Sequence, residues 1–215
     1  MQKKNIDIFF TTLQKLYPEN RTDLIWKTPW QLLVAVVMSA QTTDKQVNNV
    51  TKHFFDNIQT PYDTLQLSLE QRSQLIKGVN YAPTKARNLY TTAQMLTEGR
   101  THPNYHIPDT LSDLIKLSGV GEKTAKVILH VLYNTNDIAV DTHVHRVMNR
   151  IGLVNTASPI QTSKIIDNAI PKRYAYIAHH TLIFFGRYHC LARKPKCESC
   201  PFTSFCRYYK NNINS

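Results

Sequence analysis

The sequence predicts an all-α protein, and three observations lead to that fold class. Apolar residues recur with helical periodicity along nearly the whole chain. No segment sustains the two-residue alternation, bounded by hairpin turns, that a half-buried strand shows. Residues typical of helix ends separate the periodic segments: Thr28 and Pro29 suit an N-cap and first helical position, and Gly99, Gly152 and Gly186 suit C-terminal caps.

The predicted helices follow one another without a linker or an internal repeat. The first carries Ile6, Phe9, Phe10, Leu13 and Leu16 on one face and ends near Pro18, and the second runs from the Thr28 cap through Met38. Further helices are expected near 43–57, 69–77, 84–98, 110–117, 122–134, 142–151, 158–170 and 173–186, about ten in all. Side chains expected only to pack between helices are Leu32, Leu33, Val36, Val127, Ile128 and Leu132.

Composition bounds the size and the partner. A chain of 215 residues, 42% hydrophobic, has material for one large domain or two small intertwined ones. The formal net charge of +11 favours a polyanionic partner, although a charge excess can also be only a solvated surface. The start, MQKKNIDIFF, lacks the apolar stretch of a signal peptide, and no apolar run is long enough to span a bilayer. We expect a cytoplasmic protein in a reducing compartment, with no transit peptide and no membrane contact.

All four cysteines lie close together near the C-terminus. Their spacing is Cys190-x6-Cys197-x2-Cys200-x5-Cys206, and basic residues lie in the first gap. Structural disulfides are disfavoured, because a chain of this size in a reducing compartment needs none. Four thiolates suit either a structural zinc ion or a [4Fe–4S] cluster, and the spacing alone does not decide between them.

A helix, a tight turn and a second helix are predicted over 111–134. The turn Ser118-Gly-Val-Gly121 holds two of the six glycines, so another backbone can approach it closely. Exposed N–H groups at the start of the second helix would suit a phosphate of DNA, without reading its sequence. The alternative is an ordinary turn between two helices.

Lys123 lies in the first turn of the second predicted helix. A cation there opposes the helix dipole, which disfavours the ammonium form relative to the neutral amine. A neutral amine can attack a carbon centre and form a Schiff base. The alternative is a solvated surface lysine.

Asp141 precedes the predicted helix at 142–151. Aspartate at such a position is usually an N-cap, but its carboxylate could also accept a proton from a lysine and stabilise a developing sugar cation. The two roles are compatible. His143 and His145 have no third metal ligand nearby in the sequence, so we expect His143 to contact phosphate or substrate.

Four segments together resemble the endonuclease III family of helix-hairpin-helix DNA glycosylases. They are Leu117-Ser-Gly-Val-Gly-Glu-Lys-Thr-Ala125, Ile138-Ala-Val-Asp-Thr-His-Val144, Gly186-Arg-Tyr-His-Cys190 leading into the cysteine loop, and Met38-Ser-Ala-Gln-Thr-Thr-Asp44. The resemblance runs over nearly the full length in the family's order, and it implies a [4Fe–4S] cluster rather than zinc. It also implies two helical domains flanking a DNA-binding cleft: a barrel at 22–135, and a cluster domain formed by 1–21 and 136–215.

The resemblance further implies a bifunctional enzyme of base excision repair. Lys123 would attack the sugar of a flipped, oxidised pyrimidine nucleotide with help from Asp141, and the resulting Schiff base would lead to cleavage 3′ of the abasic site by β-elimination. The partner would be duplex DNA with damaged pyrimidines or abasic sites in the nucleoid, and we expect a monomer. Residues expected to contact DNA are Gln41, Tyr81, Gly119, Gly121, His143, Arg193, Lys194 and Lys196.

The chain departs from the family's pattern at two places. Ser118 stands where the family usually has proline, which predicts a less rigid hairpin. Tyr81 stands at the position of an apolar wedge beside the flipped nucleotide, so lesion and opposite-base preference could differ. For Tyr81 and for Gln41, the plainer interpretation is a polar or aromatic side chain on the surface.

Two rival functions remain open at this point. A monofunctional adenine or mismatch-thymine glycosylase is disfavoured by Lys123, because such relatives place another residue there. A non-enzymatic, metal-stabilised DNA-binding protein would need neither Lys123 nor Asp141. A Ser-His-Asp hydrolase is unsupported, since the chain has no G-x-S-x-G segment.

Overall fold

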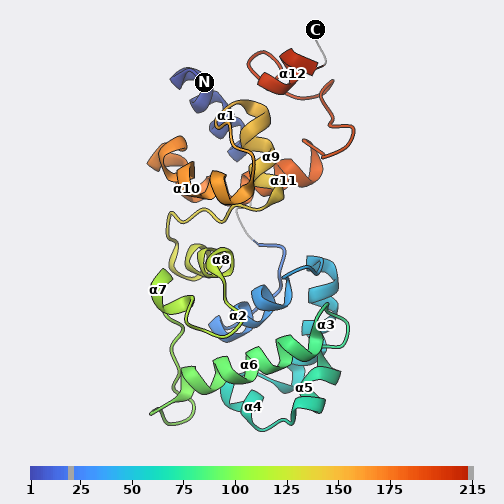
Figure 1. The fold of residues 1–215 in the computed structure, drawn as a ribbon, viewed down its shortest axis with the longest axis vertical. Coiled ribbons are helices and arrows are strands. Elements are labelled where there is room, and N and C mark those ends of the chain that lie inside the picture. The colour runs from blue at the N-terminus through green and yellow to red at the C-terminus, as the bar shows by residue number, and fades with distance from the viewer. Residues whose placement is uncertain (19–21, 213–215) are drawn as a thin grey trace. The chain divides into compact units, whose positions relative to one another are not determined.

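A computed structural model describes residues 1–18 and 22–212, and these residues form helices and no strand. This confirms the all-α prediction. The helices are α1 (Lys3–Leu16), α2 (Pro29–Met38), α3 (Asp44–Asn57), α4 (Pro61–Leu65), α5 (Leu69–Leu75), α6 (Ala82–Thr97), α7 (Leu111–Leu114), α8 (Glu122–Tyr133), α9 (Thr142–Ile151), α10 (Pro159–Ala169), α11 (Lys172–Tyr188) and α12 (Arg207–Asn212) (Figure 1). In the described part of the chain, no helix is both long and apolar enough to cross a membrane.

The helices group into two compact units. Unit 1 combines Met1–Arg21 with Asn134–Ser215, and unit 2 is the continuous segment Thr22–Tyr133. Unit 1 is therefore built from both ends of the chain, with unit 2 inserted between them. Each unit has its own hydrophobic core.

Unit 2 is organised around α2, whose residues from Trp30 to Met38 are all buried. A helix that is apolar all round has to be covered on every side, and α2 packs against α3, α6 and α8. It begins as the sequence predicts: Thr28 is the N-cap, its hydroxyl accepts a hydrogen bond from Gln31 N at 3.2 Å, and Pro29 follows.

Unit 1 is held together by aromatic contacts between its two chain segments. Phe9 and Phe10 of α1 are fully buried; Phe10 stacks on Tyr174 of α11, and Phe9 packs edge-on against Phe185 and Phe202. Asp7 accepts hydrogen bonds from Arg173 and Tyr174, and those bonds lower its pKa. In Figure 1 the blue α1 lies beside the orange helices of the C-terminal segment.

The structure differs from the prediction in two short helices, α4 and α12, and in the place of Gly186. The short helices α4 and α12 were not predicted, although Thr60 and Asp63 form a capping box that marks the start of α4. Gly99 and Gly152 have positive φ just beyond α6 and α9, as predicted for helix ends. The prediction for Gly186 is wrong, because Gly186 lies inside α11, where a Cβ would come within 2.8 Å of His143 Cβ. Close packing against another helix, and not a turn, requires glycine there.

Candidate active site and cysteine loop

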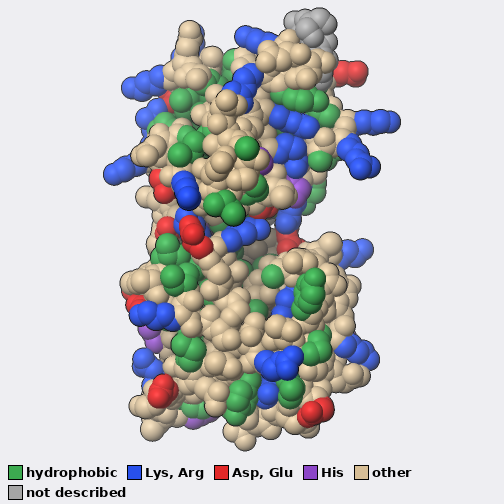
Figure 2. All heavy atoms as spheres, in the orientation of Figure 1, with side chains coloured by type: hydrophobic (Ala, Val, Ile, Leu, Met, Phe, Trp, Pro, Cys, Tyr) green, Lys and Arg blue, Asp and Glu red, His purple; other side chains and the backbone are tan. Residues whose placement is uncertain are grey.

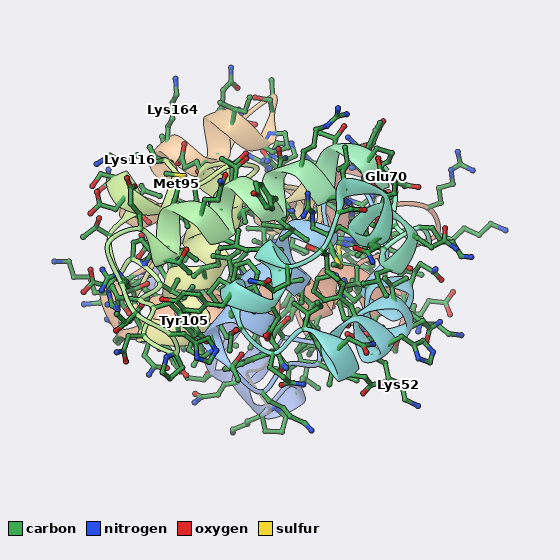
Figure 3. All side chains as sticks on the ribbon, turned by 90° about the horizontal axis from the view of Figure 1, so that it is seen from below. Lys52, Glu70, Met95, Tyr105, Lys116 and Lys164 are labelled. Carbon is green, nitrogen blue, oxygen red and sulfur yellow. The ribbon has the colours of Figure 1, made fainter. Side chains whose placement is uncertain are left out.

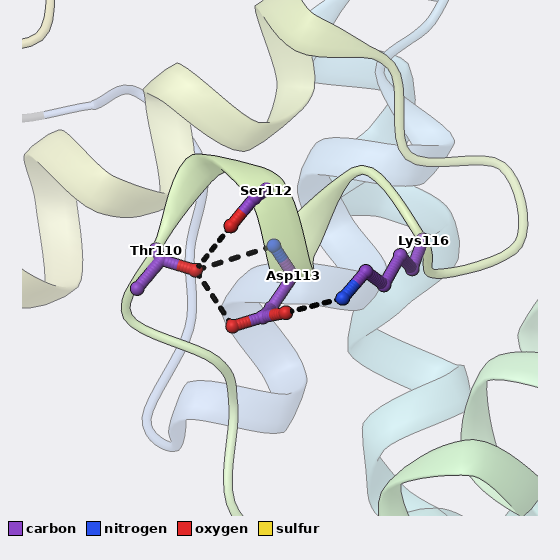
Figure 4. Close-up of polar contacts among 4 residues, drawn as sticks. All are labelled: Thr110, Ser112, Asp113 and Lys116. Carbon is purple, nitrogen blue, oxygen red and sulfur yellow. Dashed lines mark hydrogen bonds and ion pairs between the residues drawn. The ribbon is translucent and has the colours of Figure 1, made fainter.

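A small polar cluster of Thr110, Asp113 and Lys116 lies around the short helix α7, at the start of the hairpin of unit 2. The Thr110 hydroxyl accepts a hydrogen bond from Asp113 N at 3.2 Å and donates one to Asp113 Oδ2 at 2.8 Å, and Lys116 Nζ contacts Asp113 Oδ1 at 2.7 Å (Figure 4). The Lys116 bond, followed by the Thr110 bond, lowers the pKa of Asp113. These bonds hold the first turn of α7 on its exposed side, and Leu114 is buried on the other side.

The turn between α7 and α8 is anchored by apolar side chains on both sides of its glycines. Leu117 and Val120 are buried, and Val120 N donates to Leu117 O at 3.1 Å. Gly119 has φ +80°, a conformation that side chains disfavour, and a Cβ there would lie 2.7 Å from the Asn88 amide. Gly121 faces open space instead. The turn is thus pressed against α6 at Gly119 and open at Gly121.

Lys123 is the second residue of α8 and is exposed. Its neighbour Glu122 pairs with Lys126 at 2.9 Å, one turn further along the helix. Among the residues that the structure describes, the Lys123 amine has no hydrogen bond or ion pair within its own unit. The side chain is therefore available to a ligand at the N-terminal end of α8.

Asp141 of unit 1 is the N-cap of α9, as the sequence predicts. Its Oδ1 accepts hydrogen bonds from His143 N at 2.8 Å and Val144 N at 2.9 Å. Its other carboxylate oxygen, Oδ2, makes no hydrogen bond to the described residues of this unit. One oxygen caps the helix, and the second has no hydrogen-bond partner in the described part of unit 1.

The start of α9 is tied to α11 and to the cysteine loop by Arg146. Its Nε donates to Cys190 O at 3.0 Å, and its Nη2 donates to Gly186 O at 2.8 Å and lies 3.2 Å from His143 Nδ1. Burial lowers the pKa of His143, and the Arg146 charge lowers it further, although Asp141 opposes the shift. His143 therefore favours its neutral form, while His145 is turned to Thr162 Oγ1 at 2.7 Å.

Gln41 and Tyr81 lie on two turns of unit 2 that are bonded to each other. Both residues are exposed and both have positive φ, at 58° and 60°. Asn80 joins the turns, since its side chain donates to Gln41 O and its backbone N–H donates to Thr42 Oγ1 at 3.1 Å. Tyr81 is 64% exposed, so the ring projects from the surface beside the Gln41 turn. Two residues in this disfavoured conformation thus lie on one bonded pair of turns.

The cysteine loop, 190–206, begins at the end of α11 and ends before α12. Phe202 is fully buried and anchors the loop by packing against Phe9 and Phe185. All four cysteines line one cavity, and Arg150 reaches into it, with Nη1 3.6 Å from Cys190 Sγ and 2.6 Å from Leu191 O. The Arg150 guanidinium is covered by the Tyr208 ring of α12 at 4.4 Å.

The thiols of this loop share one cavity, although among the described residues no three metal-ligating side chains already lie close enough together to hold a metal ion. Burial raises the pKa of Cys190 and Cys197, and it raises that of Cys200 to about 11. Neighbouring cysteines raise these pKa values further, because one thiolate disfavours the ionisation of another. Such a set becomes stable as thiolates when a cationic centre compensates the repulsion, as a metal cluster does.

The basic residues of the loop are directed outward. Arg193, Lys194 and Lys196 are exposed, and Lys194 has φ +49°. Lys and Arg side chains are plentiful over unit 1 on the face that Figure 2 shows. The loop thus combines an inner face of sulfur with an outer face of positive charge.

Several residues that hold these sites in place were not identified from the sequence. In unit 1 they are Arg146 and Arg150, which connect α9 to the cysteine loop; in unit 2 they are Asn80, Lys85, Asn88 and Thr92, which support the two turns and the hairpin. Three of the unit 2 residues could have been found from the sequence, because the polar residues Lys85, Asn88 and Thr92 recur at the spacing of one helix face.

Comparison with known protein families gives two matches. Residues 34–172 match the HhH-GPD superfamily of base excision DNA repair proteins, and residues 190–206 match the iron–sulfur binding domain of endonuclease III. The second match decides between the two metals that the cysteine spacing left open. The four cysteines would hold a [4Fe–4S] cluster, and zinc is set aside.

The chain is similar to endonuclease III proteins over its full length. It is 41% identical to that of Rickettsia prowazekii, with all of both chains covered, and 36% identical to that of Escherichia coli, with 95% of each covered. Among solved structures, a trapped covalent endonuclease III–DNA intermediate matches with a TM-score of 0.88 at 40% identity, covering 98% of each chain. A thermostable thymine-DNA glycosylase, at 21% identity and a TM-score of 0.82, shares the fold.

Proposed function

Because the chain belongs to the HhH-GPD superfamily of base excision DNA repair proteins, and within it to the endonuclease III family of DNA glycosylases and AP lyases, we propose that Lys123 is its nucleophile and Asp141 its catalytic carboxylate. The substrate is duplex DNA with an oxidised pyrimidine or an abasic site. The protein acts as a monomer, in the cytoplasm, on DNA of the nucleoid.

The reaction begins with a damaged nucleotide turned out of the duplex, where its C1′ can be reached. The neutral Lys123 amine attacks C1′, and the bond between C1′ and the base nitrogen breaks, so that the base leaves with the electron pair and takes up a proton. Asp141 accepts the proton released by the attacking amine and stabilises the positive charge on the sugar. The sugar ring then opens to a Schiff base between Lys123 and C1′.

Strand cleavage follows from the Schiff base. The cationic imine makes the C2′ proton acidic, a base removes it, and the 3′ phosphate leaves as the C3′–O bond breaks. Hydrolysis of the imine then returns the free lysine. The chain thereby cleaves 3′ of the abasic site by β-elimination, with no external oxidant or reductant.

Other exposed groups would hold the DNA around this centre. Gln41 would enter the gap left by the flipped base, and Tyr81 would stack beside it. The backbone at Gly119 and Gly121 would contact phosphate through the start of α8, and His143 would contact phosphate or substrate. The [4Fe–4S] cluster, held by the four cysteines, would keep the loop folded so that Arg193, Lys194 and Lys196 face the DNA backbone.

One observation carries this proposal more than any other. Lys123 presents an exposed, unpaired side chain at the N-terminal turn of α8, directly after a turn that is pressed against the rest of unit 2. A structural lysine would normally contact a carboxylate or a carbonyl, as Lys126 does with Glu122. Lys123 opposes the dipole of its own helix and is placed for a ligand.

Reductive trapping tests the proposal. Borohydride should crosslink the wild-type protein to duplex DNA carrying an abasic site or an oxidised pyrimidine, and Lys123→Gln should lower crosslinking by more than about a thousandfold. Its affinity for an uncleavable duplex should stay within about threefold. Lys52→Gln is the matched control, since Lys52 is an exposed lysine of the same unit, and it should crosslink normally. Normal crosslinking by Lys123→Gln would refute the role of Lys123, and no crosslinking by the wild type would indicate a monofunctional or non-enzymatic protein.

A further inference from the structure

Helix α6 presents one polar stripe along its length. Its N-cap Tyr81 and its residues Lys85, Asn88 and Thr92 are spaced by four, three and four positions, so they lie on one face of the helix. Lys85 is 5% exposed and Thr92 is 1% exposed, so this part of the stripe faces the protein, whereas Tyr81 at its start is 64% exposed. Buried polar side chains need partners, and here those partners lie in two functional turns.

The first end of the stripe holds the turn that carries Gln41. The Lys85 ammonium donates to Met38 O at 2.7 Å and to Ala40 O at 2.8 Å, so a buried cation closes the C-terminal end of α2 directly before Gln41. Its burial lowers the pKa of Lys85. Asn80 then bonds the Gln41 turn to the Tyr81 turn. Gln41 and Tyr81 are therefore held by the N-terminal end of α6.

The second end of the stripe holds the hairpin that precedes Lys123. The Ser118 hydroxyl donates to Asn88 Oδ1 at 3.1 Å, and Thr92 Oγ1 donates to Ser118 O at 3.0 Å. Gly119 packs so closely on Asn88 that a Cβ would reach the amide at 2.7 Å. Ser118 is thus fixed through both its side chain and its carbonyl group.

We propose that α6 is a positioning element, in which Asn88 and its bond to Ser118 set the place of the hairpin and hence of Lys123. On the same face, Lys85 holds the end of α2 before Gln41, and Thr92 holds the Ser118 carbonyl group. The two residues lie about 10 Å apart along the helix axis. The inference rests on the proposed role of Lys123. None of these α6 residues touches the reacting atoms: they act through the hairpin and the turns.

The Ser118–Asn88 bond also bears on one expectation from the sequence. Serine at position 118 predicted a less rigid hairpin, because the side chain alone does not restrict the backbone as proline does. In the folded protein the hydroxyl group supplies a restraint of a different kind, by bonding the turn to α6. The restraint therefore disappears if either partner is removed, and proline can replace it by fixing φ directly.

The test compares Asn88→Ala and Ser118→Ala with Ser118→Pro, and uses Thr91→Ala on the exposed face of α6 as the matched control. Three quantities are measured on an abasic duplex: the single-turnover rate of borohydride trapping at saturating enzyme, the dissociation constant, and the thermal midpoint. Asn88→Ala and Ser118→Ala should trap about ten- to a hundredfold more slowly, because a small displacement of a nucleophile lowers the rate steeply. Their dissociation constants should stay within about twofold, since the phosphate contacts remain.

Ser118→Pro should return the trapping rate to within about threefold of the wild type, which a loss of general stability would not allow. Trapping at the wild-type rate by Asn88→Ala and Ser118→Ala would overturn the inference, as would a Ser118→Pro protein as slow as Ser118→Ala. Peptide mapping of the wild-type crosslink separates this result from failure of the proposed function. A crosslink at a residue other than Lys123 refutes the nucleophile, whereas a crosslink at Lys123 with unaffected variants refutes only the role of α6.

Discussion

The two units of this protein differ in charge and in what they hold in place. Unit 1 has 15 Lys and Arg against six Asp and Glu, a net of +9, while unit 2 has 11 against nine, a net of +2. Nearly all of the excess positive charge, which predicts a polyanionic partner, thus lies in the unit with the cysteine loop. Lys123, Gln41 and Tyr81 belong to the nearly neutral unit. Under the proposed function, the general attraction to a phosphate backbone and the placement of the Lys123 nucleophile would be carried by different parts of the chain.

The cores of the two units differ in a corresponding way. Unit 2 surrounds the aliphatic helix α2, and its hairpin and turns are held by polar contacts with α6. Unit 1 packs phenylalanine rings from three distant segments around the base of the cysteine loop. Aromatic packing joins the loop to the core at Phe202 and Phe205, and the cluster is expected to hold the cysteines around them. The two cores thus differ in kind, and unit 1 is the one whose stability an added cluster is expected to raise.

The strongest test of this division concerns Asp141, the one proposed catalytic residue in the basic unit. Asp141→Asn keeps an oxygen that can cap α9, so unit 1 should keep its stability, but the loss of the carboxylate should slow single-turnover base excision by roughly 10² to 10⁴-fold. Asp141→Ala should be equally slow and should also lose about 1 kcal/mol of stability through the cap. Near-normal excision by Asp141→Asn would mean that unit 1 only binds DNA.

Salt dependence sharpens the comparison with a smaller effect. Replacing Arg193, Lys194 and Lys196 by Gln should reduce the slope of log affinity against log salt by about 0.9 for each phosphate that is no longer neutralised. Replacing Lys27, Lys52 and Lys116 of unit 2, all exposed, should change the slope by less than about 0.9 in total. Lys52 extends away from the ribbon in Figure 3. Equal slopes for the two triple variants would show that the charge difference between the units does not govern binding.

The smallest expected effect is on pH dependence. Burial lowers the pKa of His143 below its ordinary value of 6.5, so the unfolded chain takes up a proton at a higher pH than the folded one. The stability that neutral His143 contributes above pH 6.5 is therefore lost as the pH falls through the lower pKa that His143 has in the folded protein. The visible absorbance of the cluster reports unit 1 and the fluorescence of Trp26 and Trp30 reports unit 2. Mild acid, above the range in which carboxyl groups such as Asp113 take up protons, should therefore lower the urea midpoint of the first signal alone. His143→Gln should weaken that dependence, while His53→Gln, at an exposed site in unit 2, should leave it unchanged.

Much of the fold could be predicted because local signals agree with the packing. The Thr28 cap before Pro29, the apolar run of α2 and the positive-φ Gly152 each follow from residue chemistry near in sequence, and the structure confirms them. The short helix α12 could not be predicted, since it has no buried residue and is held by Arg207, which donates to Asn149 O and Val154 O. Those partners lie more than fifty positions away.

The site was predictable where chemistry restricts the residue type, and not where support comes from packing. Clustered cysteines, a lysine after a glycine turn and a capping aspartate each stand out in the sequence. Gly186 was misread because a glycine near a helix end and a glycine under a crossing side chain look alike until His143 is placed. Asn88 and Thr92 looked like ordinary helix residues, and only their hydrogen bonds to Ser118 set them apart.

The docking of α1 has a consequence for how the chain is made. Asp7 bonds to Arg173 and Tyr174, which lie 166 and 167 positions further along. At ordinary rates of synthesis, α1 leaves the ribosome roughly ten to thirty seconds before its partner helix exists. Phe9, Phe10 and Leu13 are then an uncovered apolar face while the continuous unit 2 is already free to fold. Helix α1 is thus translated well before its partner helix, and during that interval its apolar face can contact other chains.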